Sequence, residues 1–342
     1  MELPETTLQM PIIRPAEVDR WPRGIAYQDG FKIIGTPLGF GKTKDAKLRF
    51  LSSLEERVPR KHERILLHRA LLRPLGCEDR NVDALAIDFG RKIRLGRMEI
   101  ELFPAGLGPG TTQLKISFRD RQILYCGGVR SAKPLFSPPM EIPECDLLLL
   151  DFPTAEPRPA APSRTAKEIA AWLSRMSTSH AAVVACGSKT AALDAFWILR
   201  SLDIPISASR NLFELFRRSA DVLGNMSGLS RLEQVFPRQG VVLVTQEQWE
   251  KSRFRSASLS DRTAYAGPGT GAPEDVTACF RLGEGEDRSG IAGYVKQTGA
   301  SQIVLGRQCD EGLTDYLTKA GLNVFRVTRP IQIPFPFLSR RQ

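Results

Sequence analysis

The feature that most constrains the fold is a change in the hydrophobic pattern along the chain. Up to Gly128, apolar residues mostly alternate with polar ones and glycine separates the runs, which is typical of hairpins and a strand meander. Residues 145–154, CDLLLLDFPT, then form a continuous apolar run, as expected for a strand covered on both faces. From residue 165 onward, strand-like and helix-like segments alternate, which predicts a parallel sheet with helices on it. The expected fold class is therefore α/β.

A Pro-rich stretch at residues 156–165, EPRPAAPSRT, predicts the boundary between these regions. Ser163 or Thr165 is expected to cap the helix that follows. Residues 252–272 are rich in Ser, Gly and Arg and predict a loop, and residues 330–342 predict a Pro-rich tail. The pattern is thus β-rich, then α/β twice, and the middle block is expected to be an inserted domain.

The composition excludes several classes of protein. A hydrophobic fraction of 42% and a charged fraction of 25% exclude a mainly disordered chain, a collagen and a disulfide scaffold. No apolar run approaches the roughly 20 residues that cross a bilayer, and the first residues do not resemble a signal peptide. The expected location is cytoplasmic and no membrane partner is expected. The six cysteines are widely scattered with no CxxC pair and are interpreted as small buried hydrophobes.

The net charge is the first functional indication. The chain has 48 Lys and Arg against 38 Asp and Glu, a difference of +10. Such a balance favours a polyanionic partner such as nucleic acid, although a basic balance also serves solubility. Only three histidines are present, His62, His68 and His180. A di-zinc hydrolase of the usual kind uses about five, because imidazole is its main ligand, so any metal hypothesis must account for this shortage.

Five segments resemble, in order, those of one enzyme family. Residues 103–116, FPAGLGPGTTQLKI, resemble the PAGH-x-x-GSAQ stretch of metallo-β-lactamase-fold nucleases with a β-CASP domain, and most of all the bacterial DNA exonucleases associated with ligases and Lhr-type helicases. Residues 122–130 resemble a strand that ends in Ser-Gly-Asp. Residues 144–157 resemble the family's CD-x-x-x-x-E-x-T-x-x-x-P strand. Residues 183–199 resemble the strand–GKAQ–helix that opens the β-CASP insertion, and residues 280–324 resemble the end of the family.

The resemblance implies a metallo-β-lactamase-like αββα sandwich with an inserted β-CASP-like α/β domain. The sandwich would comprise residues 1–164 and 273–342, and the insertion residues 165–272. It also implies where zinc ligands would lie. Those positions carry other residues here: Ser53, Glu55, Arg57, Val58, Leu107, Gly128, Gly285 and Arg307. Because Leu, Gly and Val donate no electron pair and Arg stays charged, no metal site and no cofactor are expected.

An alternative hypothesis is that the protein is a metal-dependent enzyme. Asp151, Asp287 and Glu55 are candidate catalytic carboxylates, which would hold Mg²⁺ or Mn²⁺ in a divergent nuclease or phosphoesterase with exonuclease-like hydrolase activity. The competing interpretation is that Asp151 caps a neighbouring turn and that the other two carboxylates are solvated. Arg307 would then fill the former metal pocket by pairing with Asp287 or Asp151, or would hold a phosphate.

Several basic residues are candidates for contacts with nucleic acid or phosphate. Lys189 lies at a strand-to-helix junction, where an anion binds a helix N-terminus; the alternatives are a solvated lysine and a small-molecule phosphate sensor. Basic clusters interleaved with phenylalanine favour single-strand binding, although Phe213 and Phe216 also fit a buried helix face. The candidates are Lys189, Arg307, Arg217, Arg218, Arg253 and Arg255.

The leading hypothesis is a catalytically silent relative of β-CASP exonucleases, with no catalytic residues. It would be a nucleic-acid-binding or scaffold subunit in a DNA- or RNA-processing or repair complex. The expected partners are a nuclease, helicase or ligase subunit, nucleic acid, or both. A homodimer or a heterodimer is compatible with this hypothesis.

Overall fold

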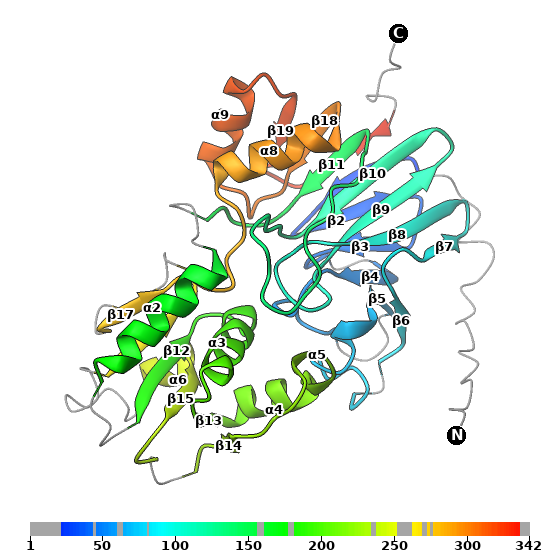
Figure 1. Cartoon of the computed structure of the whole chain (residues 1–342). Helices are drawn as coiled ribbons and strands as arrows, with labels where there is room; N and C mark the ends of the chain where they lie inside the picture. The colour runs from blue at the N-terminus through cyan, green and yellow to red at the C-terminus, as the bar shows by residue number, and fades with distance from the viewer. Residues whose placement is uncertain are drawn as a thin grey trace.

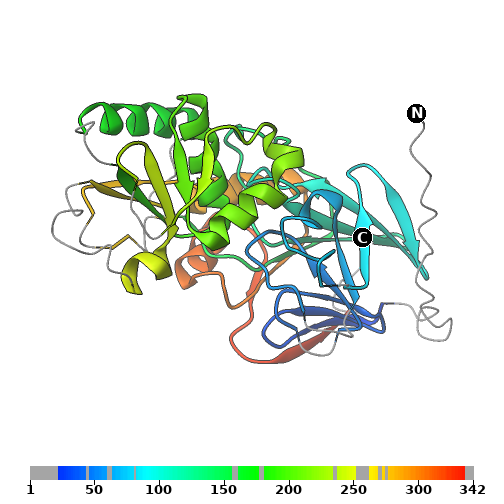
Figure 2. The same cartoon turned by 90° about the horizontal axis from the view of Figure 1, so that it is seen from below.

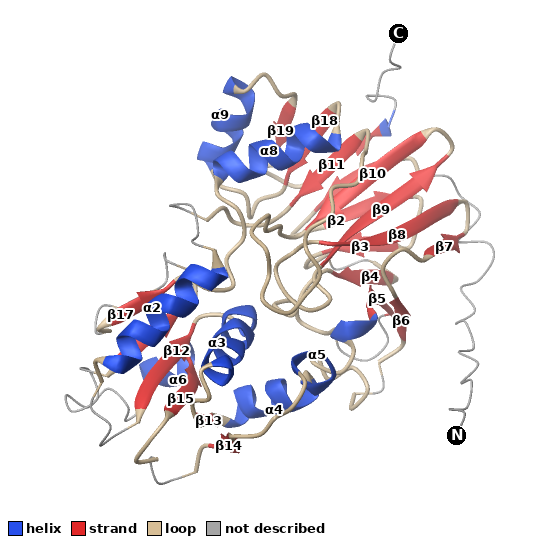
Figure 3. Cartoon of the chain, viewed as in Figure 1, coloured by secondary structure: helices blue, strands red, loops and turns tan. Residues whose placement is uncertain are grey.

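A computed structural model describes residues 22–43, 46–59, 64–80, 82–155, 161–176, 181–233, 237–251, 262–268, 272–273 and 276–335. These residues form three sheets, called A, B and C here, and helices pack on sheets B and C (Figures 1 and 3). The expected α/β class is confirmed. Within the described ranges, every helix is too short or too polar to cross a bilayer.

Sheet A is a mixed sheet built from the N-terminal strands and one strand near the C-terminus. Its order is β20(Ile331–Pro334), β1(Gly24–Tyr27), β2(Phe31–Ile34), β3(Leu38–Phe40), β4(Leu48–Leu51), β5(Arg64–His68) and β6(Ala84–Ile87). The pairs from β20 to β3 are antiparallel, and those from β3 to β6 are parallel. A 3-10 helix, η1(Arg69–Leu71), follows β5.

Sheet B contains the predicted meander and the continuous apolar strand. Its order is β19(Val324–Arg326), β18(Gln302–Leu305), β11(Leu147–Leu150), β10(Arg121–Cys126), β9(Thr112–Phe118), β8(Met98–Pro104) and β7(Lys92–Leu95). Strands β7 to β10 are antiparallel, whereas β10, β11, β18 and β19 are parallel. The four leucines of β11 are all buried, because the strand is covered on both faces as its sequence predicts.

Two apolar cores hold these sheets. Sheets A and B enclose one core, in which Phe40 stacks on Tyr125 with ring centroids 4.3 Å apart and Phe31 and Phe50 meet the same tyrosine edge-on. The other face of sheet B packs against α8(Arg288–Thr298) and α9(Glu311–Lys319). Sheets A and B with α8 and α9 are called the sandwich below.

Sheet C is wholly parallel and lies beside the sandwich (Figures 1 and 2). Its order is β14(Leu229–Arg231), β13(Ile206–Ala208), β15(Val241–Thr245), β12(Ala182–Cys186), β16(Thr263–Ala266) and β17(Ala278–Phe280). One face packs against α2(Pro162–Ser174), α3(Lys189–Ser201) and α4(Arg210–Arg218), which α5(Ala220–Leu223) follows. The other face packs against α6(Gln246–Lys251) through Trp249. The predicted parallel sheet with helices is confirmed, and α2 to β17 are called the inserted unit below.

The inserted unit and the sandwich share one apolar core. Leu51, Ile65 and Leu67 from β4 and β5 belong to the same buried cluster as Phe196 of α3 and Phe216 of α4. Between β1 and β6 the described residues include one helical segment, the three-residue η1. The helices that cover this side of sheet A therefore come largely from the inserted unit.

Several local predictions were wrong. Ala161, not Ser163 or Thr165, is the N-cap of α2, and its side chain has no acceptor to cap the helix. Pro162 begins the helix at a position where its missing N–H is tolerated. Within the predicted loop 252–272, residues 263–266 form β16, and within the predicted tail, β20 pairs with β1. Sheet C also continues past residue 272 to Phe280.

Candidate functional site

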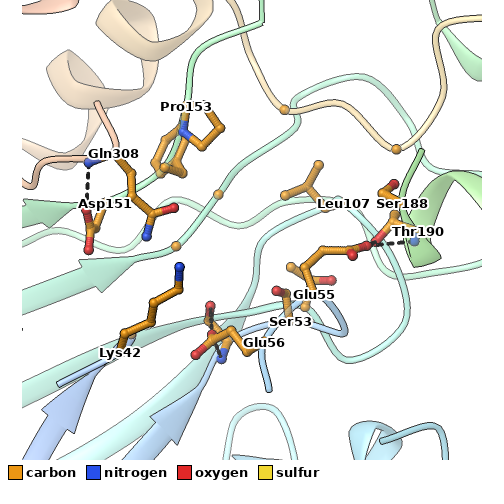
Figure 4. A pocket seen from close by; sticks show the side chains of 18 of the residues that line it. Lys42, Ser53, Glu55, Glu56, Leu107, Asp151, Pro153, Ser188, Thr190 and Gln308 are labelled. Carbon is orange, nitrogen blue, oxygen red and sulfur yellow. Dashed lines mark hydrogen bonds between the residues drawn. The ribbon is translucent and has the colours of Figure 1, made fainter. Parts of the chain in front are cut away.

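A cavity of about 760 Å³ lies where the two units meet (Figure 4). Loops that follow β3, β4, β8, β10, β11 and β18 of the sandwich form one side of its wall. The inserted unit contributes the start of α3 and the loop after β16, and the return segment after β17 also lines the cavity. A volume of this size is within the range of small-molecule and cofactor sites.

Six of the eight positions that the family resemblance assigns to zinc ligands lie on the wall of this cavity, although they are far apart in the sequence. The cavity wall includes Ser53, Glu55, Arg57, Leu107, Gly128 and Gly285, while Val58 and Arg307 are not among the lining residues. Zinc does not fit these residues, because three have no donor atom in the side chain and a fourth is a guanidinium. Within the described part of the chain, no group of three His, Cys, Asp or Glu side chains is placed to hold a metal ion.

Asp151 follows β11 and is the most buried carboxylate of the cavity wall, with 3% of its surface exposed. Its Oδ1 accepts hydrogen bonds from the Tyr27 hydroxyl and the Gln308 amide, both at 3.3 Å. Its Oδ2 is buried and has no hydrogen-bond donor. Burial raises the pKa of this carboxyl, because the charged form loses hydration that two long hydrogen bonds only partly replace.

Glu56 supplies the second desolvated carboxylate. The Ser52 amide and hydroxyl both donate to its Oε1 at 2.6 Å, so the loop after β4 holds the side chain in place. Burial raises the pKa of Glu56, and the negative charge of Asp151 adds to the shift. These two carboxylates are therefore close enough to influence each other.

Lys42 lies at the turn after β3 and reaches into the same space. Its side chain points between Asp151 and Glu56 (Figure 4). The ammonium is close enough to Asp151 to lower the pKa of that carboxyl, which partly opposes the effect of burial. The cavity wall therefore combines the carboxylates of Asp151 and Glu56 with the cations of Lys42 and Arg49.

Glu55 is not available as a metal ligand, because it caps α3. Its Oε1 accepts hydrogen bonds from the Thr190 amide at 2.8 Å and the Thr190 hydroxyl at 3.0 Å, and its Oε2 accepts from the Lys189 amide at 3.3 Å. A carboxylate at a helix N-terminus satisfies free N–H groups and complements the helix dipole. The anion that occupies this helix end is thus a side chain of the sandwich.

Lys189 is committed to the same contact. Its ammonium donates to the Leu54 carbonyl at 2.6 Å, and burial lowers the pKa of the side chain. A second cavity of about 390 Å³ beside this helix end is lined by Glu55, Glu247 and Glu250 together with Lys189. Because three of the four charged residues in this wall are glutamates, the wall is a poor setting for the phosphate expected at Lys189.

The alternative carboxylate trio is not brought together. Asp287 is the N-cap of α8, where it accepts from the Gly290 amide at 2.7 Å, and it is not among the residues that line the cavity. Its neighbours Glu284 and Glu286 are also engaged, with Arg281 at 2.8 Å and with the Ser131 amide and hydroxyl at 2.5 Å. Of the trio, Asp151 and Glu55 line the cavity, and Glu55 accepts hydrogen bonds from the first two amides of α3.

The described arginines among the candidates for nucleic-acid contacts form ion pairs with acidic side chains. Arg307 pairs with Asp29 at 3.7 Å, not with Asp287 or Asp151 as expected, and its side chain is exposed. Arg217 pairs with Glu214 at 2.9 Å and Arg218 with Asp79 at 2.7 Å. Phe213 and Phe216 belong to the core, as the buried-face interpretation predicts. Arg253 and Arg255, like His62 and His180, lie outside the described residues.

Other expectations concern histidine and cysteine. His68 ends β5, and its Nδ1 accepts a hydrogen bond from the Ala70 amide at 3.1 Å, so it caps η1. Cys126 is buried beside the cavity, and burial raises the pKa of its thiol to about 12, which excludes a reactive thiolate at neutral pH. Five of the six cysteines are buried as interpreted, whereas Cys279 is exposed.

Sequence reasoning identified Asp151, Glu55 and Arg57 but missed other charged and polar residues around the cavity. Lys42 and Glu56 belong to no motif, and Tyr27 and Gln308 are separated from Asp151 by more than a hundred residues. The run Glu55-Glu56-Arg57 was the available signal for Glu56, since consecutive charges after a strand mark a loop at a sheet edge.

The comparisons with known proteins give the fold and no activity. No family model matches the chain, and no curated protein sequence matches it. The chain is similar to a crystal structure of a protein of unknown function from Enterococcus faecalis V583, with a TM-score of 0.63 and 10% sequence identity. The similarity covers 92% of this chain and 100% of the other. The aligned region is therefore longer than the sandwich or the inserted unit alone. The combination of sandwich and inserted unit is therefore a fold that a solved protein shares.

Proposed function

We propose that this protein is a catalytically silent relative of the metallo-β-lactamase-fold β-CASP nucleases. It would act as a nucleic-acid-binding or scaffold subunit in a DNA- or RNA-processing or repair complex. One observation supports the proposal: six of the eight positions that the resemblance assigns to zinc ligands line one cavity between a two-sheet sandwich and an inserted parallel sheet, yet four of these six have no side chain that can donate to zinc. On this proposal, the fold would keep the position of a metal centre but not the residues that bind the metal.

The charge of the cavity wall supports a polyanionic partner. Lys42, Arg49 and Arg57 line the cavity, and the Arg57 side chain is exposed at the junction of the two units. Arg57 and Arg80 both lie near enough to Lys189 to lower the pKa of its ammonium, so positive charge gathers beside the cavity. A phosphate backbone is attracted to such a cluster mainly by counterion release, which depends steeply on salt.

The carboxylate hydrolase has less support. It requires Asp151, Asp287 and Glu55 at one metal centre, but two of these three side chains cap helices. A metal measurement separates the two functions. We expect less than about 0.1 metal ion per chain in the purified protein by mass spectrometry, and no degradation of single- or double-stranded DNA or RNA with Mg²⁺, Mn²⁺ or Zn²⁺. One or two bound metal ions with nuclease activity would contradict the proposal.

Nucleic-acid binding is tested by fluorescence anisotropy with labelled single-stranded DNA and RNA. We expect binding at about 50 mM salt that weakens by about tenfold or more at about 200 mM salt. Arg57→Ala should weaken binding to all sequences and reduce the salt slope by about one. The matched control is Arg91→Ala, in the turn between β6 and β7 and outside the cavity wall. Equal effects of the two variants, or no binding at low salt, would remove the nucleic-acid part of the proposal.

The scaffold part requires a protein partner. Affinity purification from the native host should recover a nuclease, helicase or ligase subunit in near-stoichiometric amount, resistant to nuclease treatment of the lysate. Absence of both a partner and nucleic-acid binding would contradict the proposal as a whole.

A further inference from the structure

The hydrogen bond that begins η1 depends on the protonation state of a histidine. The backbone of His68 is extended, and its Nδ1 lies 3.1 Å from the Ala70 amide that donates to it. A ring nitrogen that accepts a hydrogen bond carries no proton, so this contact requires the neutral imidazole with its proton on Nε2. In the imidazolium form both ring nitrogens are donors, and Nδ1 would then direct a hydrogen at another donor. The bond therefore exists only while His68 is neutral.

The surroundings of His68 hold the ring in place and favour its neutral form. The imidazole is half-buried and stacks on Phe89, with ring centroids 3.9 Å apart. Burial lowers the pKa of His68, because the charged form loses hydration. Among the described residues, the charged groups that act on the ring are Asp88, in the turn after β6, and Arg69, the next residue along the chain. Asp88 favours protonation of the imidazole and Arg69 opposes it, and these two side chains pair at 3.1 Å.

Residues 69–77, which begin with η1, join three parts of the molecule. Leu71 is fully buried in the core that the sandwich shares with the inserted unit. Arg73 pairs with Asp221 of α5 at 2.5 Å. On the other side, a Cβ at Gly110 would lie 2.8 Å from Leu71 Cγ, so the loop between β8 and β9 passes directly against η1. Because that loop lines the large cavity, a change at η1 reaches both the cavity wall and the junction of the two units.

We propose that His68 is a pH-sensitive cap: the neutral imidazole holds residues 69–77 against the cavity loop and the inserted unit, and protonation releases them. When this segment is closed the ring stays neutral, whereas in the open segment it takes up a proton near the ordinary histidine pKa of about 6.5. Opening therefore becomes more favourable as the pH falls below that value. This device goes beyond the proposed function and operates whether or not nucleic acid binds.

The test is amide hydrogen exchange of the full chain, followed by mass spectrometry of peptides that cover residues 69–77. Exchange is measured at about pH 7.5 and about pH 5 and expressed as protection factors, which remove the intrinsic effect of pH on exchange. In the wild type, protection should fall by about fivefold at the lower pH, the size expected for loss of a side-chain cap. His68→Ala, which has no acceptor, should show the reduced protection at both pH values.

A capping variant that does not titrate separates the proton from the hydrogen bond. In His68→Asn, Oδ1 takes the place of Nδ1 as the acceptor, so protection should differ by less than about twofold between the two pH values. His68→Ser replaces this variant if it does not fold, because serine is also a strong cap. A second test concerns the neighbouring charge. Asp88→Asn removes the carboxylate that favours protonation, so the loss of protection should begin at a lower pH than in the wild type.

The matched control is Asp120→Asn, which removes an exposed carboxylate from the turn between β9 and β10 and should leave the pH profile unchanged. The proposal is overturned if wild-type protection is the same at both pH values, or if His68→Asn or His68→Ser loses as much as the wild type. It is also overturned if His68→Ala keeps the wild-type protection at about pH 7.5, or if Asp120→Asn shifts the profile as far as Asp88→Asn does.

Discussion

Asp151 carries its charge in a setting that favours the neutral form. Burial raises the pKa of this carboxyl, so the folded state holds the proton more tightly than the unfolded chain does. The stability that this group contributes is complete below its ordinary pKa and is lost as the pH rises through the raised value. An amide at the same place keeps an acceptor for the Tyr27 and Gln308 donors without the buried charge.

We therefore expect Asp151→Asn to raise the free energy of unfolding by about 1 kcal/mol at pH 8, because it removes a poorly satisfied buried charge. The gain should shrink as the pH falls toward 4, where the wild-type carboxyl takes up its proton. Urea unfolding of the variant and the wild type at pH 8 and pH 4 measures this change in the free energy of unfolding. Asp315→Asn, on the exposed face of α9, should change stability by less than about 0.5 kcal/mol. A less stable Asp151→Asn protein at pH 8 would mean that the carboxylate is better compensated than its contacts indicate.

For single residues, the sequence predicts a chemical role only where the residue type alone settles what the side chain can bind. The absence of histidine at the aligned positions was visible without a structure, because leucine and glycine donate nothing wherever they lie. The roles of Glu55 and Asp287 were not visible. A solvated carboxylate, a metal ligand and a helix cap look alike in the sequence, and only a partner such as Thr190, 135 residues away, distinguishes them.

Helix α3 depends on a capping group from another part of the chain. Ser188 accepts from the Ala191 amide at 3.0 Å, while Glu55 of the sandwich accepts from the amides of Lys189 and Thr190. Glu55→Ala should therefore lower the free energy of unfolding by about 1 kcal/mol, as loss of an N-cap does. Glu55→Gln keeps one acceptor and should lose less. Chemical unfolding monitored by circular dichroism measures both variants.

The comparison variant for this prediction is Glu144→Ala, which removes an exposed glutamate from the segment before β11. It should leave stability within about 0.5 kcal/mol of the wild type. If Glu55→Ala and Glu144→Ala have the same effect, the contact between Glu55 and α3 contributes nothing measurable to the fold.

Elements with a strong internal pattern could be predicted, and very short ones could not. The run Leu147–Leu150 and the alternating segment Thr112–Phe118 have enough apolar residues to define a strand without knowledge of its neighbours. Thr263–Ala266 is only four residues long and is a strand because β12 pairs with it. Ile331–Pro334 contains proline and is half-exposed, and it pairs with β1 from the opposite end of the chain.

At the scale of the whole molecule, the two units are joined by more than the cavity. The shared apolar core runs from β4 and β5 of sheet A to α3 and α4 of the inserted unit. Beside it, Arg130 of the loop after β10 pairs with Asp194 of α3 at 3.2 Å, with 5% and 1% of the two side chains exposed. Composition and spacing indicated an insertion, but they do not encode which helix face meets which sheet face. We expect one cooperative unfolding transition for the whole chain, since an interface that continues the core couples the units.

The Arg130–Asp194 pair allows this coupling to be tested. Arg130 also donates to the Gly106 and Leu107 carbonyls at 3.1 and 2.8 Å, and the Gly283 amide donates to Asp194 at 3.2 Å. Arg130→Met leaves a buried carboxylate without its cation and should lower the free energy of unfolding by about 3 to 5 kcal/mol. Calorimetry should then resolve the inserted unit as a separate, earlier transition.

The double variant Arg130→Met, Asp194→Leu decides what the pair contributes. Replacing both partners removes the uncompensated charge. The Gly106 and Leu107 carbonyls and the Gly283 amide still lack the hydrogen bonds that the pair made with them. We expect it to recover about half of the lost stability and to restore a single transition. If the double variant is as unstable as Arg130→Met, the pair holds the units together through its bonds to the backbone and not through its charge. If Arg130→Met unfolds in a single transition, the apolar core alone couples the sandwich to the inserted unit.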